Sequence, residues 1–268
     1  SLTGSTPAQT TALDQDWELF RSYTSLDDAE SGAENTGCSL FGVSTADLNA
    51  GGGYDLVSAG MQWNIACYAD DTETLTSNWF IGGWTTDEDN YVRIFTPAGA
   101  DEVGTSQRHS GKWDTSAYHI VKSATGNYSR MLIIEEDYVH IEGLQIHNIN
   151  NDHNYAAGIY SADGEEAVYI SDNIIRGTYT TSGGDTHTGI YVNNTNLTAY
   201  VWNNIVYGYG GTTANAYGIY LRVPEGYCHN NTVFNCSTGI REYNGETVRL
   251  KNNIAQECGG SYSGSFHA

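Results

Sequence analysis

Hydrophobic and polar residues alternate in a short pattern that the chain repeats. VYISDNIIRGTY at 168–179, AYVWNNIVYGYGG at 199–211 and VRLKNNIAQECGG at 248–260 each place an asparagine between two short apolar runs. Because successive side chains of a strand point to opposite faces, each run predicts a strand with one buried face. The pattern therefore predicts pairs of short strands joined at an asparagine.

Aligning these segments defines one asparagine column with apolar columns around it. The asparagines are Asn173, Asn204, Asn231 and Asn253, and Leu144 holds the position one repeat earlier. The residues three places before this column are Ile141, Ile170, Val201, Cys228 and Leu250, and those two places after it are Ile146, Ile175, Val206, Val233 and Ala255. We expect these two columns to face the interior, and the residues beside them to face outward.

A second motif precedes the asparagine in each repeat, as AGIYSA, TGIYVNN, YGIYLRV and TGIREYN. It aligns Ile159, Ile190, Ile219 and Ile240, and the length changes fall between the motifs. A propeller blade would need four antiparallel strands, and a leucine-rich repeat would need a denser leucine pattern. A coil of two or three strands that stacks on its neighbours fits better.

The asparagine column has a physical reason in such a coil. Asparagine tolerates the left-handed backbone of a sharp turn, and its amide can bond to the backbone or to the asparagine one coil away. In these residues the chain resembles the right-handed parallel β-helix proteins, the pectate-lyase-like superfamily, whose coils carry such asparagine ladders. The resemblance implies an all-β right-handed parallel β-helix (solenoid), and this fold hosts lyases, hydrolases, phage tailspikes and adhesins.

The first part of the chain predicts an end cap and less regular coils. YTSLDDAESGAEN at 23–35 predicts a short N-terminal capping helix with Ser25 as N-cap and with Asp27 and Asp28 in its first turn. WNIACYAD, NWFIGGW and YVRIFTPA predict strands. We expect a cap and an irregular first coil over 1–60 and one continuous β-helix over 61–268. YTSLDDAE and GWTTDEDNYVRIFTPAG are also similar to uncharacterised β-helix proteins of environmental bacteria and phages, which implies no activity.

The charge of the chain limits its partners. Eleven Lys and Arg residues against 32 Asp and Glu give a net charge of −21, so nucleic acid and an anionic membrane surface would be repelled. No stretch approaches the ~18 consecutive apolar residues of a membrane span. The chain begins at Ser1 without a leader, so a secretion signal, if there was one, is already gone. We expect the protein to be extracellular, whether secreted, on a cell surface or on a virion.

The five cysteines show no zinc spacing. Cys236 and Cys258 each lie five places after a ladder asparagine. They should therefore occupy equivalent positions on adjacent coils, within reach of a disulfide. The alternative is two free thiols stacked in the core.

Two outer faces should carry aromatic rows. The first holds Tyr160, Tyr191 and Tyr220, with Asn193 and Arg222 two places further along their strands. The second holds Tyr169, Tyr200, Tyr227 and Arg249, flanked by Ser171, Trp202, His229 and Lys251. Sugar rings stack on aromatic rings while Asn and Arg bond hydroxyls and carboxylates, so a polysaccharide or cell-surface glycan is a candidate ligand of either face. Aromatic rows also stabilise sheets without any ligand.

The signals for catalysis are few. YLRVPEG resembles the arginine-x-proline element of pectate lyases, which would make Arg222 a base. The calcium ligands expected on neighbouring coils are replaced by Ala162 and Asn193. Asp185 and His187 of GGDTH are either an acid/base pair over the first face or solvated loop residues. We expect no cofactor, although CYADDTE or TTDEDN can hold a structural calcium.

Two functions remain. In the first, the protein is an extracellular or virion-surface structural or adhesive β-helix that can hold glycans. In the second, it is a polysaccharide lyase or glycoside hydrolase acting on a uronic-acid-rich polymer. The missing carboxylate pairs favour the first. The polar C-terminal segment GGSYSGSFHA is too short for an obvious cap, so we also expect a homo-oligomer or a segment of a longer rod.

Overall fold

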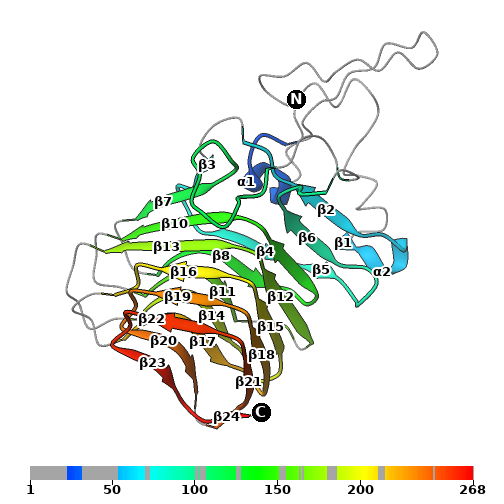
Figure 1. Ribbon diagram of the computed structural model, residues 1–268. Coiled ribbons are helices and arrows are strands. Elements are labelled where there is room, and N and C mark those ends of the chain that lie inside the picture. The colour runs from blue at the N-terminus through cyan, green and yellow to red at the C-terminus, as the bar shows by residue number, and fades with distance from the viewer. Residues whose placement is uncertain are drawn as a thin grey trace.

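The chain forms three parallel sheets that share their strands in rotation (Figure 1). The computed structural model describes residues 23–31, 54–69, 73–99, 102, 107–124, 128–150, 155–162, 164, 166–179, 186–210, 215–243 and 245–267. Apart from a two-stranded sheet of β1 (Tyr54–Asp55) and β5 (Trp84–Thr85), successive strands enter sheets 1, 2 and 3 in turn. This is a parallel β-helix, which confirms the predicted fold class.

Sheet 1 contains the strands that precede the asparagine column. They are β2 (Trp63–Ala66), β6 (Val92–Phe95), β9 (Val139–Glu142), β12 (Ala167–Ser171), β15 (Thr198–Trp202), β18 (Glu225–His229), β21 (Thr247–Lys251) and β24 (Phe266–His267).

Sheet 2 follows the asparagine column. Its strands are β3 (Glu73–Thr74), β7 (Ile120–Ala124), β10 (Gln145–Asn150), β13 (Ile174–Tyr179), β16 (Ile205–Tyr207), β19 (Thr232–Phe234) and β22 (Ile254–Gln256).

Sheet 3 carries the second motif. Its strands are β4 (Trp79–Gly82), β8 (Ser129–Glu135), β11 (Ala156–Ser161), β14 (His187–Asn193), β17 (Ala216–Arg222), β20 (Thr238–Glu242) and β23 (Gly260–Ser263).

The strand registers confirm the predicted interior columns. Ile141 pairs with Ile170 and, one coil further, Ile170 pairs with Val201 in sheet 1. Ile159 and Ile190 pair in the same way in sheet 3. All five side chains are buried in one continuous core. Side chains of the same apolar type therefore stack from coil to coil, and this stacking removes their surface from water in the same way in each coil.

The asparagine ladder lies in the two-residue turn between sheets 1 and 2. The structure divides the two roles that the sequence analysis gave to one residue. The residue before each ladder asparagine adopts the left-handed backbone, with φ of 58° at Asp172, 57° at Asn203, 55° at Asn230 and 55° at Asn252. The ladder asparagine itself points its amide inward, so the prediction was right for the amide and wrong for the backbone.

Asn204 shows how the buried amides satisfy one another. Its Oδ1 accepts hydrogen bonds from the backbone N–H and from the Nδ2 of Asn173, at 3.1 and 3.0 Å. Its own Nδ2 donates to the carbonyl oxygen of Ile170 at 2.9 Å and to Oδ1 of Asn231 at 3.0 Å. Each amide thus links the coils on either side of it, and no buried donor of the turn is left without an acceptor.

A short helix closes the N-terminal end of the stack, as predicted. Helix α1 (Leu26–Ser31) begins after Ser25, whose Oγ accepts a hydrogen bond from the N–H of Asp28 at 3.0 Å. Leu26 and Ala29 belong to the same core as the coils. Figure 1 shows α1 at the opposite end of the stack from β24. A second helix, α2 (Leu56–Ala59), was not predicted from the sequence.

A column of glycines lets sheet 3 fold without steric conflict. In sheet 3 the glycine that precedes each column isoleucine has no partner in the strand register. Ala157 pairs with Thr188 and Ile159 pairs with Ile190, whereas the glycines between them are left out. A Cβ on Gly189 would lie 2.2 Å from Cγ1 of Val206 and 2.7 Å from the carbonyl oxygen of Gly218. The glycine and the following isoleucine therefore both face the interior, as in a β-bulge, and only glycine fits.

Replacement of Asn204 by alanine should destabilise the fold by about 3 kcal/mol, because two buried donors of Asn173 lose their acceptor. Urea unfolding measures the change. The neighbouring exposed Asn203 supplies the control, since N203G keeps the left-handed turn and should alter the free energy of unfolding by less than about 0.5 kcal/mol. Equal effects of N204A and N203G would contradict the ladder as a stabilising element.

Replacement of Gly189 by alanine should cost about 1–3 kcal/mol, because the added methyl group overlaps Val206 and a backbone oxygen. Thermal unfolding of G189A can be compared with that of G260A in β23, where the nearest atom to the new Cβ would be 4.0 Å away. G260A should be nearly neutral. A G189A protein as stable as G260A would show that no close approach exists.

Candidate glycan-binding faces

The outer face of sheet 1 carries a continuous stack of rings. The ring centroids are 4.4 Å apart for Tyr91 and His140, 4.3 Å for His140 and Tyr169, 4.9 Å for Tyr169 and Tyr200, and 5.0 Å for Tyr200 and Tyr227. Beyond the last ring, the guanidinium carbon of Arg249 lies 5.2 Å from the centroid of Tyr227. The rings of Tyr200 and Tyr227 therefore have neighbours on both faces, which leaves no free ring face for a ligand to stack on, and the hydroxyl of Tyr227 already donates to Glu225 at 2.7 Å.

Trp202 lies beside this stack, in register with Ser171 and His229. It is half-buried. No other ring of the described part of the chain stacks on Trp202. Of the three predicted carbohydrate-binding residues on sheet 1, Trp202 alone has no other ring of the described residues stacked on it.

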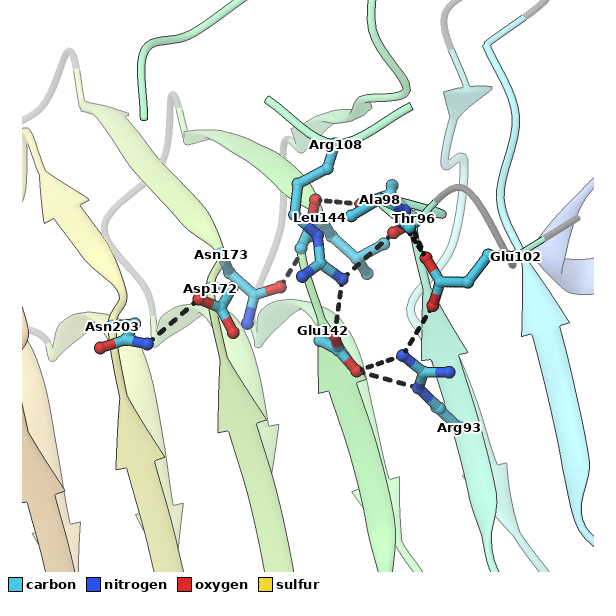
Figure 2. A network of polar contacts seen from close by, with 12 residues as sticks. Arg93, Thr96, Ala98, Glu102, Arg108, Glu142, Leu144, Asp172, Asn173 and Asn203 are labelled. Carbon is cyan, nitrogen blue, oxygen red and sulfur yellow. Dashed lines mark hydrogen bonds and ion pairs between the residues drawn. The ribbon is translucent and has the colours of Figure 1, made fainter. Parts of the chain in front are cut away.

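A network of ion pairs lies at the corner of sheets 1 and 2, near the N-terminal end, and the sequence analysis missed it (Figure 2). Glu142 accepts from Arg93 at 2.7 Å and from Arg108 at 2.6 Å, and Arg93 also contacts Glu102 at 3.4 Å. Burial is the largest single influence on the pKa of Glu142 and raises it. The hydrogen bonds and charges of the two guanidiniums together outweigh burial, so the pKa of Glu142 lies below its usual value. These ion pairs tie Glu102 and Arg108, which follow β6, to the neighbouring strands. The two positive and two negative charges cancel, so the network has no net charge that would attract a ligand.

The outer face of sheet 3 brings together the five residues predicted there. Tyr160, Tyr191 and Tyr220 lie in register, and the rings of Tyr191 and Tyr220 stack at 4.7 Å. Asn193 donates to Oη of Tyr160 at 3.3 Å and accepts from Arg222 at 3.3 Å. The tyrosines were expected to point into water, yet Tyr160 and Tyr220 are only 5% and 7% exposed because their neighbours cover them.

Three arginines lie over tyrosines that belong to sheet 3 or directly follow one of its strands. The guanidinium carbon of Arg130 lies 3.5 Å from the ring centroid of Tyr160, and that of Arg241 lies 5.0 Å from Tyr220. Arg222 lies 4.7 Å from the ring centroid of Tyr243. These are cation–π contacts, which hold each guanidinium at a fixed place on the face. Nη1 of Arg241 also donates to Oη of Tyr217, and Nη1 of Arg222 donates to Asn193, which leaves the other N–H groups of these two guanidiniums for a ligand.

Within the described residues, four arginines form no ion pair, and three of them lie on this face; the fourth, Arg176 of β13 in sheet 2, contacts His147 instead. Arg93, Arg108 and Arg249 are each ion-paired with a glutamate. In the part of the chain that the structure describes, the three arginines of sheet 3 form no ion pair with a carboxylate. In a chain with a net charge of −21, such arginines are available for an anionic ligand.

Of the predicted catalytic residues that the structure describes, Arg222 lies on an outer face and His187 does not. Asp185 lies outside the described residues. His187 begins β14 but is 1% exposed and stacks on Tyr179 at 4.2 Å, so its imidazole cannot reach over the tyrosine face. Burial raises the pKa of Tyr191 and Tyr220 above the usual value of 10.0, which favours the neutral phenol over a tyrosinate base. Arg222 does lie on the outer face, as predicted.

The two segments proposed for a structural calcium differ in what can be said of them. Residues 70–72 of CYADDTE lie outside the described residues. In TTDEDN, Oδ1 of Asp87 already accepts from the N–H groups of Asp89 and Asn90, at 2.9 and 2.7 Å, within its own turn. The described residues contain no group of three or more His, Cys, Asp or Glu side chains that could hold a metal ion.

Cys236 and Cys258 are both free thiols on adjacent coils. The N–H of Gly259 donates to the carbonyl oxygen of Cys236 at 3.1 Å, which sets the two cysteines side by side. Burial, together with the neighbouring thiol of Cys258, raises the pKa of Cys236 to about 12. The structure describes the two thiols as free, and the raised pKa of Cys236 makes its reactive thiolate scarce.

No helix within the described ranges combines the length and the apolar character that crossing a bilayer requires. Comparisons with protein-family models, with curated proteins and with solved structures found no match. The assignment of a function to this β-helix therefore depends on the chemistry of its outer faces.

Replacement of His140 by phenylalanine should make stability less dependent on pH. Burial, reinforced by Arg93 and only partly offset by Glu142, lowers the pKa of His140 from 6.5 to about 4 in the folded chain. Between these values the unfolded state binds more protons, so the free energy of unfolding falls as the pH drops from 6.5 towards 4.

The variant H140F keeps a ring in the stack but removes this proton, and the slope of the free energy of unfolding against pH should decrease by up to about 1.4 kcal/mol per pH unit. Urea unfolding across this pH window gives both slopes. His147, whose pKa burial also lowers to about 4, stays in the variant, so part of the slope remains. Identical slopes for H140F and the wild type would show that His140 is protonated equally in both states.

Proposed function

We propose that the protein is an extracellular or virion-surface structural or adhesive β-helix that binds an acidic polysaccharide along the outer face of sheet 3. The observation that carries this proposal is a set of three arginines, Arg130, Arg222 and Arg241, on one face of a strongly acidic chain, none of which forms an ion pair with a carboxylate of the described residues. Guanidinium groups bind carboxylates and sulfates through paired, charge-assisted hydrogen bonds.

The spacing of the arginines suits an extended ligand. They lie on β8, β17 and β20, so the first and the last are separated by four strand spacings, or about 19 Å. Asn193 and the hydroxyls of the tyrosines lie between them and can bond the hydroxyls of sugar units. A polymer that runs along the axis of the β-helix would meet these groups in succession.

The resemblance of the repeats to the right-handed, pectate-lyase-like β-helices supports a saccharide ligand on one flat face. The alternative function, a lyase or hydrolase of a uronic-acid-rich polymer, shares this ligand but requires a base or a carboxylate pair. The burial of His187 and the raised pKa of Tyr191 and Tyr220 argue for binding rather than cleavage.

Replacement of both Arg222 and Arg241 by glutamine should abolish binding of acidic glycans. A glycan array that contains uronic-acid polymers, sulfated polymers and neutral polymers identifies the ligand, and calorimetry measures the affinity. Each arginine should account for about a ten- to 150-fold change in the dissociation constant. The wild-type affinity should also fall with added salt, because charge–charge attraction is screened.

The matched control is R249Q, which removes the same charge from sheet 1, where Glu225 pairs with Arg249. This variant should bind like the wild type. Loss of binding in R249Q with full binding in the Arg222 and Arg241 variant would place the glycan on sheet 1 and refute the proposal. Shortening of the bound polymer during incubation would favour the enzymatic alternative.

A further inference from the structure

A pair of exposed tyrosines stands at the upstream corner of sheet 3, where β8 and β11 begin. Tyr128 and Tyr155 are 53% and 44% exposed, and their rings stack at 5.4 Å with an angle of 9° between them. They precede β8 and β11, which are neighbours in the sheet. Contact of two adjacent aromatic rings with water is unfavourable, and exposed apolar surface of this kind often marks a binding site.

The backbone of Tyr128 holds its ring away from the core. Its φ of 62° lies in the left-handed region, which is unfavourable for a bulky side chain. The carbonyl oxygen of Tyr128 accepts from the N–H of Arg130 at 2.9 Å and from Nδ2 of Asn78 at 3.2 Å, and these bonds fix the conformation. Tyr138 has a similar φ of 51° but is half-buried. A strained position that keeps an aromatic ring in water is typical of a binding site.

Arg130 links this pair to the rest of the sheet 3 face. Its guanidinium carbon lies 3.5 Å from the ring centroid of Tyr160 and 5.6 Å from that of Tyr128. Within the described residues its guanidinium makes no hydrogen bond and no ion pair, and none of its nitrogens is buried without a partner. The corner thus combines an open aromatic surface with a cation whose donors face solvent.

We propose that this corner is a subsite for one uronate unit of the polysaccharide, which stacks its ring on the Tyr128–Tyr155 pair and places its carboxylate on Arg130. The subsite rests on the proposed function, because it takes one unit of the same chain, and it marks the end of the binding face. Aromatic stacking fixes the position of the sugar ring, and the planar guanidinium selects a carboxylate over a neutral hydroxymethyl group.

The test uses Tyr128→Asn, because asparagine tolerates the left-handed backbone and removes the ring. Calorimetry with oligomers of galacturonic acid of increasing length should show a loss of affinity of about five- to 150-fold for the longer oligomers. The melting temperature of Y128N should equal or exceed that of the wild type, since the strain is relieved. A purely structural stack predicts the opposite, a lower melting temperature with unchanged affinity, and that result would overturn the subsite.

Three further variants define the subsite. Tyr155→Ala should repeat the loss of affinity without changing the backbone of Tyr128. Arg130→Gln should weaken the galacturonate oligomer but leave a neutral oligomer of equal length unaffected. Phe234→Ala removes an exposed ring from the outer face of sheet 2 and should bind like the wild type.

The outcomes separate the subsite from the proposed function. If Y128N and Y155A bind every oligomer like the wild type while the Arg222 and Arg241 variant does not bind, the subsite is wrong and the proposed function stands. If the wild type binds no acidic oligomer, both are wrong. Loss of affinity in both sets of variants supports both.

Discussion

Parallel pairing of each strand with the equivalent strand one coil away is the interaction on which the rest of the structure depends. The register puts the same type of residue at the same place in successive coils, about 4.8 Å apart. This spacing is favourable for Ile170 above Ile141, for one buried amide above another, and for one phenol ring above the next. It is unfavourable for like charges, which repel at that distance.

The distribution of arginines follows from this constraint. No arginine of sheet 3 lies directly opposite another, since Arg222 pairs with Asn193 and Arg241 pairs with Tyr220. On sheet 1 the arginines flank the stack of rings, with Arg93 opposite His140 and Arg249 opposite Tyr227. Positive charges are therefore separated by neutral or aromatic partners, and a ligand with several negative charges can meet them one at a time.

Much of the fold could be predicted because the same apolar and asparagine positions recur in several coils. The interior columns and the amide ladder follow from periodicity, and the cap at Ser25 follows from local helix chemistry. The sequence could not show which residue of each turn takes the left-handed backbone and which supplies the buried amide. Asparagine suits both roles, and it occupies both positions in three of the four turns. Arg108 was missed because it belongs to a long connection that repeats nowhere else. The rings of sheet 1 were placed correctly, but their mutual stacking, which removes the ring faces from any ligand, follows only from the coil spacing.

The fixed length of the asparagine turn determines where this chain can grow. From β9 onward, every connection from sheet 1 to sheet 2 is two residues long, since an added residue would displace an amide from the ladder. The other two corners range from the short connections 223–224 and 235–237 to the long connection 208–215. Both of these variable corners border sheet 3. Insertions and deletions acquired during evolution would therefore accumulate around that one face, which can gain new walls and new specificity while the scaffold beneath it stays the same.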